Sequence, residues 1–249
     1  PKTPKPRVLE IKFLLFKMDS SLSEPHNKNG WLAKWIDRIP FVNWIDKDAD
    51  IDFAKYESFP FNAATAADDA MRSIALPELI ERQLPNLAIF SVMSDVDTTI
   101  DTRASLLLLS ALHDVKIRPA NSLDTLVYYG DKTTITSDFP KDYRVLNPQC
   151  KNATCKNIHG ISHIAVVNSP DNPYYGIAGA YRNCGSYLDD DTLYKQCKTT
   201  EKPNIGERTA ENIAAFPTFQ RLTYNPYFTE QALYIKQFIK QVEGSQGNQ

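Results

Sequence analysis

The sequence predicts an α/β fold in which a parallel sheet is flanked by helices. In the second half of the chain, short continuous apolar runs alternate with helical patterns, as in NLAIFSV (86–92), RASLLLLSALH (103–113) and LDTLVYYG (123–130). Such runs are typical of strands buried on both faces of a parallel sheet. With 249 residues, 42% of them hydrophobic and 23% charged, the chain is long enough to bury a sizeable core.

The first 84 residues differ from the rest, because they carry helical patterns and no convincing strand. Three segments repeat apolar residues at helical spacing, namely 7–18, 29–39 and 62–84, the last with a break near Pro77. We therefore predict a helical cap or lid region over 1–84 and an α/β core over 85–249.

Within the core, the remaining pattern predicts further short elements. A third strand is expected over 142–147, a short extended piece over 162–167, and helices over 206–216 and 228–243. Three or so strands are too few for a well-covered parallel sheet with this many helices. This shortage suggests that part of the sheet lies outside the sequence.

The four cysteines fall in two local pairs, Cys150 with Cys155 and Cys184 with Cys197, both in polar, turn-rich segments. Three pairings are possible, and the local one, Cys150–Cys155 with Cys184–Cys197, is the simplest. Zinc binding is a weaker alternative, because neither pair has C-x-x-C spacing. Disulfides would indicate an extracytoplasmic location, in a periplasm or outside the cell.

Charge and motifs argue against several function classes. The net charge is −2 and the basic residues are scattered, so nucleic acid is not an expected partner. The longest apolar runs, such as 106–109, are too short for a transmembrane segment. The chain carries no P-loop, dinucleotide fingerprint, H-E-x-x-H motif or calcium loop, so we expect neither a cofactor nor a metal.

The candidate catalytic residues are acids that follow the strand 86–92 and a histidine in a later loop. Three aspartates compete in SVMSDVDTTID, namely Asp95, Asp97 and Asp101. Catalytic groups of α/β sheets gather at the carboxyl ends of strands, although capping of the next helix would also explain an aspartate here. His159 and His163 share a turn, whereas His113, at a helix end, is expected to be exposed.

Two stretches resemble a known family. PNLAIFSVMSDVDTTIDTRAS is similar to the acid-bearing strand and turn of α/β-hydrolases, and GISHIAVVNSPDNPYYG resembles the histidine loop of the serine aminopeptidase and lysophospholipase-like branch. The resemblance selects Asp97 as the acid that orients His163 as the general base. It implies a serine hydrolase, esterase/lipase-like or peptidase-like, that transfers an acyl group to water.

The resemblance also implies parts that this sequence does not contain. No G-x-S-x-G elbow occurs, and the nearest fragments are HGISH and CGSYL. The nucleophilic serine would then lie upstream of Pro1 or on another chain, such as a separate N-terminal part, and this chain would be the C-terminal part of the hydrolase with its cap. Segment 131–160 must be an insertion that brings the chain back to the site.

The substrate class is left open as a small molecule, a lipid or a peptide. Aromatic residues of the cap region would suit an apolar acyl or aromatic substrate, although packing within the cap explains them equally well: Trp31, Trp35, Phe41, Trp44 and Phe53. Two alternatives remain, a non-catalytic protein that binds a ligand or partner on a hydrolase-derived scaffold, and an unrelated secreted α+β domain.

Overall fold

The computed structural model describes residues 35–36, 38–39, 44–46, 59–73, 88–113, 123–149 and 155–246. The chain divides into two compact units, Pro1–Leu84 and Pro85–Gln249. Each unit is considered by itself. That the first unit acts as a cap stays a prediction.

The first unit contains two short strands that the sequence pattern did not predict. β1 (Trp44–Asp46) and β2 (Phe59–Pro60) pair antiparallel and lead into helix α3 (Phe61–Ser73). These strands have three and two residues, too few to produce a visible alternation of apolar and polar side chains. Within the predicted helix 62–84, α3 confirms the part up to residue 73.

Several expectations for this unit fall on residues outside the described ranges, namely helix 7–18, residues 74–84, Trp31, Phe41, Phe53 and the side chain of Trp44. Of the predicted helix 29–39, Trp35 and Ile36 are helical, residues 38–39 form a turn and a bend, and the rest lies outside the described ranges. The Trp35 side chain is 65% exposed, so packing inside the unit does not account for it.

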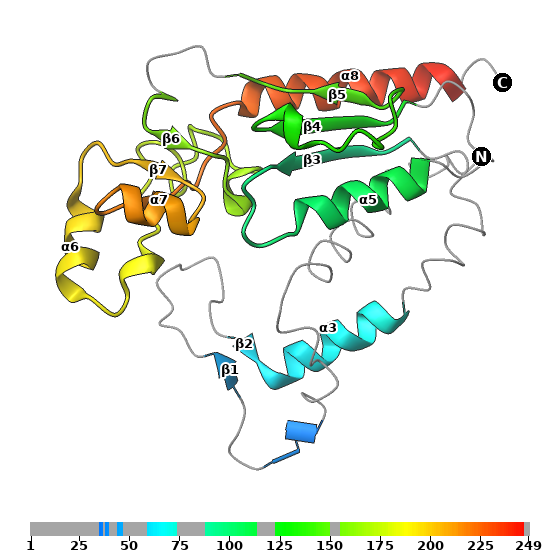
Figure 1. Cartoon of the computed structure of the whole chain (residues 1–249). Helices are drawn as coiled ribbons and strands as arrows, with labels where there is room; N and C mark the ends of the chain where they lie inside the picture. Colours follow the sequence, from blue (N-terminus) through cyan, green and yellow to red (C-terminus); the bar gives the residue numbers. More distant parts are fainter. Residues whose placement is uncertain are drawn as a thin grey trace, which may run out of the picture. The chain divides into compact units, whose positions relative to one another are not determined.

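The second unit is built around a parallel sheet, in the order β3-β4-β5 (Figure 1). Its strands are β3 (Phe90–Ser94), β4 (Thr125–Tyr129) and β5 (Arg144–Leu146). All five residues of β4 are buried, so both faces of the central strand are covered. Parallel strands with helices α5 (Thr102–His113) and α8 (Phe228–Gln246) confirm the α/β class.

Alternating residues of β4 serve opposite faces of the sheet. Val127 and Tyr129 share a core cluster with Tyr234 of α8, and Phe90 of β3 packs on Phe238 of the same helix with ring centroids 5.3 Å apart. Leu126, also fully buried, has the opposite parity and points to the other face. The predicted strands 123–130 and 142–147 and helices 103–113 and 228–243 are confirmed in position. The strand predicted over 86–92 is displaced toward the C-terminus, because β3 begins at Phe90 and ends at Ser94.

A second parallel sheet, in the order β6-β7-β8, was not predicted. Its strands are β6 (Ile158–His159), β7 (Ile205–Gly206) and β8 (Gln220–Arg221). The predicted helix 206–216 is wrong at its start, because Gly206 pairs with Arg221 in this sheet. Helix α7 is only Ala210–Ala215, and the side chain of Thr209 caps it by accepting a hydrogen bond from the Asn212 backbone N–H.

The segment between Cys184 and Cys197 is helical rather than turn-rich. After the 3-10 turn η5 (Gly185–Tyr187), helix α6 (Asp191–Thr199) begins with Asp190 as its cap. Another 3-10 turn, η2 (Lys132–Thr134), follows β4. The predicted Cys184–Cys197 disulfide is present, with a Cα–Cα distance of 6.0 Å. Both cysteines are buried, so they also contribute to the core. Cys155 is disulfide-bonded as well, and Cys150 lies outside the described residues.

Candidate functional site

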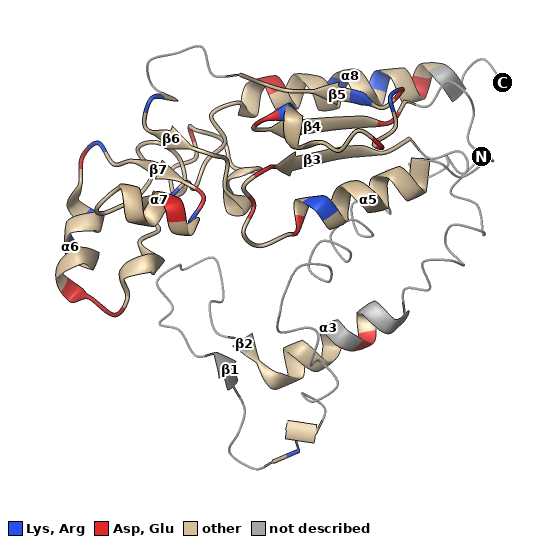
Figure 2. Ribbon diagram, in the orientation of Figure 1, with Lys and Arg blue, Asp and Glu red and all other residues tan. Residues whose placement is uncertain are grey.

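The acidic turn after β3 contains the three candidate aspartates, and the structure gives each a different partner. Acidic residues follow the carboxyl end of β3 (Figure 2, red). Asp95 accepts a hydrogen bond from the Asp131 backbone N–H at 2.8 Å, next to the end of β4. Asp101 caps α5 by accepting from the Ala104 N–H at 3.0 Å. Only Asp97 of the three contacts a histidine side chain in the described structure.

Asp97 is held firmly by the backbone of its own turn. One carboxylate oxygen, Oδ1, accepts hydrogen bonds from the N–H groups of Thr99 and Ile100 at 2.8 and 2.9 Å. Burial raises the pKa of Asp97, but the hydrogen bonds from His163, Ile100 and Thr99 outweigh burial and lower it overall. Asp97 is therefore ionised near neutral pH, and its second oxygen, Oδ2, is directed at His163.

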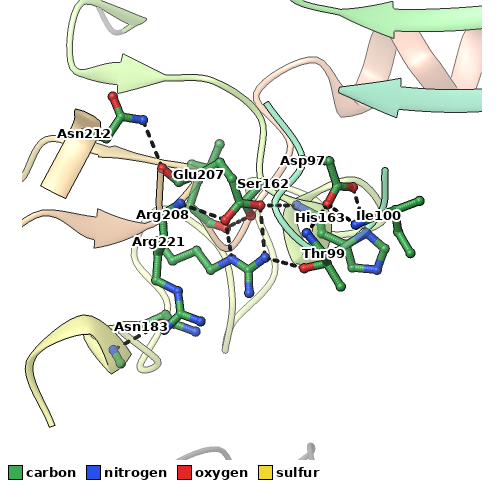
Figure 3. A network of polar contacts seen from close by, with 12 residues as sticks. Asp97, Thr99, Ile100, Ser162, His163, Asn183, Glu207, Arg208, Asn212 and Arg221 are labelled. Carbon is green, nitrogen blue, oxygen red and sulfur yellow. Dashed lines mark hydrogen bonds and ion pairs between the residues drawn. The ribbon is translucent and has the colours of Figure 1, made fainter. Parts of the chain in front are cut away.

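His163 faces Asp97 through Nδ1, which lies 2.9 Å from Oδ2 (Figure 3). Because an ionised carboxylate can only accept, Nδ1–H donates this hydrogen bond, and in the neutral ring Nε2 then carries the lone pair. The side chain of His163 is 34% exposed and that of Asp97 only 10%. The acid is thus largely shielded from solvent, whereas about a third of the histidine side chain is exposed.

The loop that carries His163 is a helical turn and not the extended piece predicted over 162–167. His163 begins the 3-10 turn η4 (His163–Ala165). The backbone groups of this run are satisfied partly within the turn and partly by distant segments: the Ala165 N–H donates to the Ser162 carbonyl at 3.0 Å, whereas the Val166 carbonyl accepts from Asn225 Nδ2 at 3.1 Å.

Two glycines, Gly130 and Gly160, let two other segments of the chain pack closely against the acidic turn after β3. At Gly130 φ is +121°, and an added Cβ would lie 2.0 Å from the Asp95 carboxyl carbon. At Gly160 φ is +84°, and an added Cβ would lie 2.3 Å from Val96. Segment 131–160 therefore ends against the turn that holds Asp97, as the pairing of that acid with His163 requires.

A buried ion pair beside His163 was missed by sequence reasoning. Glu207 is fully buried and Arg221 is 7% exposed, with Arg221 Nε 2.9 Å from Glu207 Oε1. Glu207 Oε2 accepts from the His163 backbone N–H at 3.0 Å. A single sequence offers no signal for this pair, because isolated Glu and Arg residues between short elements are usually solvated.

His113 was expected to be exposed, and the structure corrects this. Its side chain is only 7% exposed, with Nδ1 2.9 Å from Asp124 and Nε2 2.9 Å from Asp142. Asp124 precedes β4 and also accepts from the Ile89 N–H at 2.8 Å. This cluster therefore lies at the amino ends of β3, β4 and β5, whereas Asp97 follows the carboxyl end of β3. It connects the beginnings of the three strands to the end of α5.

Within the described ranges, no group of three or more His, Cys, Asp or Glu side chains is arranged to hold a metal ion. A helix long and apolar enough to span a membrane is also absent from that part of the chain. No protein-family model matches the sequence, and neither a curated protein nor a solved structure matches it.

Proposed function

We propose that this chain supplies the acid and the general base of a serine hydrolase built on the α/β-hydrolase fold. The observation that carries the proposal is the 2.9 Å contact between His163 Nδ1 and Asp97 Oδ2, with Asp97 at the carboxyl end of β3. In such a pair the carboxylate fixes the imidazole tautomer and stabilises the imidazolium that forms during the reaction. His163 Nε2 takes the proton of the nucleophile and delivers it to the leaving group.

The nucleophile of this proposal lies outside the sequence described here. Ser162, next to the histidine, is fully buried and its hydroxyl donates to the Leu222 carbonyl at 2.5 Å, so it cannot serve. The serine would be located upstream of Pro1 or on another chain, together with the backbone N–H that forms the oxyanion hole. The substrate would be an ester or amide of a small molecule, lipid or peptide.

The disulfides bear on where the protein works. Cys184–Cys197 is buried beside Tyr187, and Cys155 is disulfide-bonded as well. Structural disulfides persist in oxidising compartments. We therefore place the proposed hydrolase in a periplasm or outside the cell.

One observation favours a second candidate, a non-catalytic protein that binds a ligand or partner on a hydrolase-derived scaffold. The described serine nearest to His163 is unsuitable as a nucleophile, and no G-x-S-x-G is present in the sequence. This candidate predicts that neither Asp97 nor His163 affects any hydrolytic activity.

The deciding experiment is fluorophosphonate labelling of the protein as its own cells make it, followed by peptide mapping of the labelled residue. A labelled serine upstream of Pro1 or on a companion chain, with labelling lost in His163→Gln, supports the serine hydrolase. His159→Gln is the matched control, because His159 ends strand β6 four residues before His163 but contacts Asn204 at 3.0 Å and not Asp97. Absence of labelling in the natural product would favour the binding protein.

A further inference from the structure

Glu207 and Arg221 form an ion pair that belongs to the second sheet. Glu207 directly follows β7, and Arg221 lies in β8, paired in register with Gly206. Arg221 contacts both oxygens of the carboxylate, with Nε 2.9 Å from Oε1 and its NH2 nitrogen 2.9 Å from Oε2. A buried ion pair loses so much hydration energy that it contributes little net stability. The role of this pair is therefore better inferred from the other groups that it contacts than from its contribution to stability.

Those further contacts reach both members of the candidate dyad (Figure 3). On one side, Glu207 Oε2 accepts from the His163 backbone N–H at 3.0 Å. On the other side, the same NH2 nitrogen of Arg221 donates to Thr99 Oγ1 at 2.9 Å. The backbone N–H of Thr99 in turn donates to Asp97 Oδ1 at 2.8 Å. The acid turn and the histidine turn are thus fastened to one rigid, charged group.

We propose that Glu207 and Arg221 are positioning residues that set the distance and orientation between Asp97 and His163. The proposal rests on the proposed function for its catalytic meaning, but the geometry it describes is a property of this chain alone. Productive general-base geometry requires placement within about 0.5 Å and 10–20°, which needs support from surrounding hydrogen bonds. Neither residue contacts a reacting atom, so both act through the dyad.

A purely structural role is the competing interpretation. Glu207 Oε1 also accepts from the Arg208 backbone N–H at 2.7 Å, a contact that serves only the local turn. If the pair only stabilised the second sheet, removing the hydrogen bond between Arg221 and Thr99 would leave the tautomer ratio of the His163 imidazole unchanged. The side chain of Thr99 is the point where the two interpretations differ.

The test uses the full chain and three substitutions in one turn. Thr99→Val removes the oxygen that accepts from Arg221 while keeping the ion pair, and Thr99→Ser restores it. Thr98→Val is the matched control, because Thr98 is the exposed neighbouring threonine. Glu207→Gln is a fourth variant, but it leaves a buried guanidinium without its counter-charge and is expected to lower the melting temperature strongly.

The readout is the tautomer ratio of His163, measured by long-range ¹H–¹⁵N correlation NMR at about pH 8.5, where an ordinary imidazole is neutral. His163→Gln assigns the ring signals. We expect the ratio of the Nδ1–H to the Nε2–H form to fall about tenfold in Thr99→Val, in line with a weakened charge-assisted hydrogen bond. Thr99→Ser and Thr98→Val should stay within about twofold of the unsubstituted chain, which is at most about a third of that effect in free energy.

An unchanged ratio in Thr99→Val would overturn the proposal and leave the pair a structural element of the second sheet. The NMR readout needs neither nucleophile nor substrate, so it is independent of the proposed function. If the tautomer ratio falls in Thr99→Val but the natural protein shows no fluorophosphonate labelling, the positioning role stands and the hydrolase fails. If labelling is present and the ratio is unchanged, the hydrolase stands and the positioning role fails.

Discussion

Replacing Asp97 with asparagine keeps the size of the side chain and removes its charge. In the structure, Oδ1 accepts from the N–H groups of Thr99 and Ile100 at 2.8 and 2.9 Å, whereas Oδ2 faces His163 Nδ1 at 2.9 Å. Two backbone donors require an oxygen at the first position, so the NH2 group of the amide must face the imidazole. Nδ1 then has to accept, and the proton moves to Nε2, the nitrogen that should take the proton of the nucleophile.

The expected size of the effect follows from this exchange of tautomers. In the proposed hydrolase, kcat should fall about 10⁴-fold, as expected when the general base is held in the wrong tautomer. The free energy of unfolding near neutral pH should fall by about 1.5–3 kcal/mol, the contribution of a hydrogen bond to a charged group. The Asp97 side chain is only 10% exposed, so water can replace little of this interaction.

Two assays measure these effects. The ring ¹⁵N shifts of His163 report the tautomer in this chain alone, and hydrolysis of a p-nitrophenyl ester by the protein as its cells make it reports kcat. Asp95→Asn and Asp101→Asn are the controls, since those side chains contact the Asp131 and Ala104 backbone. The reasoning is refuted if Asp97→Asn retains the Nδ1–H tautomer, or if activity is lost only in Asp95→Asn.

The same variant tests a pH dependence. Burial raises the pKa of Asp97, but hydrogen bonds, first of all from His163, lower it below the reference value of 3.8. The ionised carboxylate therefore stabilises the folded chain fully above that reference value, and this stability is lost as the pH falls through the lower folded-state pKa. Urea unfolding at a series of acidic pH values should show a shallower acid-side decrease for Asp97→Asn. Parallel curves for the two proteins would exclude this contribution.

Three further substitutions test the surroundings of the site, each by urea unfolding. Gly130→Ala should destabilise the fold by about 1–3 kcal/mol, because φ is +121° there and the new Cβ would overlap a carboxyl group; an effect near zero would contradict the geometry. Replacing both Cys184 and Cys197 with alanine should cost about 3 kcal/mol for a crosslink across 13 residues, and reduction of the unsubstituted protein should cost at least as much, because it also breaks the disulfide of Cys155. His113→Ala removes the imidazole from the fully buried Asp124 and should cost about 3 kcal/mol or more, whereas a loss below about 1 kcal/mol would show that the contact is dispensable.

The parts of the fold that could be predicted from the sequence are those with a continuous physical signal. The buried run at 125–129 is apolar at every position except Thr125, and the helix 102–113 places an apolar residue toward the core at each turn. The strands of the second sheet have only two residues each, so no period exists to detect. Their positions are decided by tertiary pairing rather than by local preference.

Some residues of the candidate site could likewise be predicted from the sequence, and others could not. Asp97 and His163 could be selected because they stand in short patterns that resemble a known family. Glu207 and Arg221 could not, because each is buried only in the presence of the other and of the turns they contact. The local reading of residues 162–167 as extended was wrong because it considered the apolar run without the neighbours that satisfy its backbone.

The link between Arg221 and Thr99 spans 122 residues of sequence, and the contact of His163 with Asp97 spans 66. Contacts of such separation form only after the ends of long loops have been brought together, which is slow and entropically costly. During synthesis, the segment that carries Asp97 therefore leaves the ribosome long before Arg221 exists. A nascent chain that ends before β8 would contain Asp97 and His163 but not Arg221, so the proposed positioning of the dyad would arise only after β8 has been synthesised.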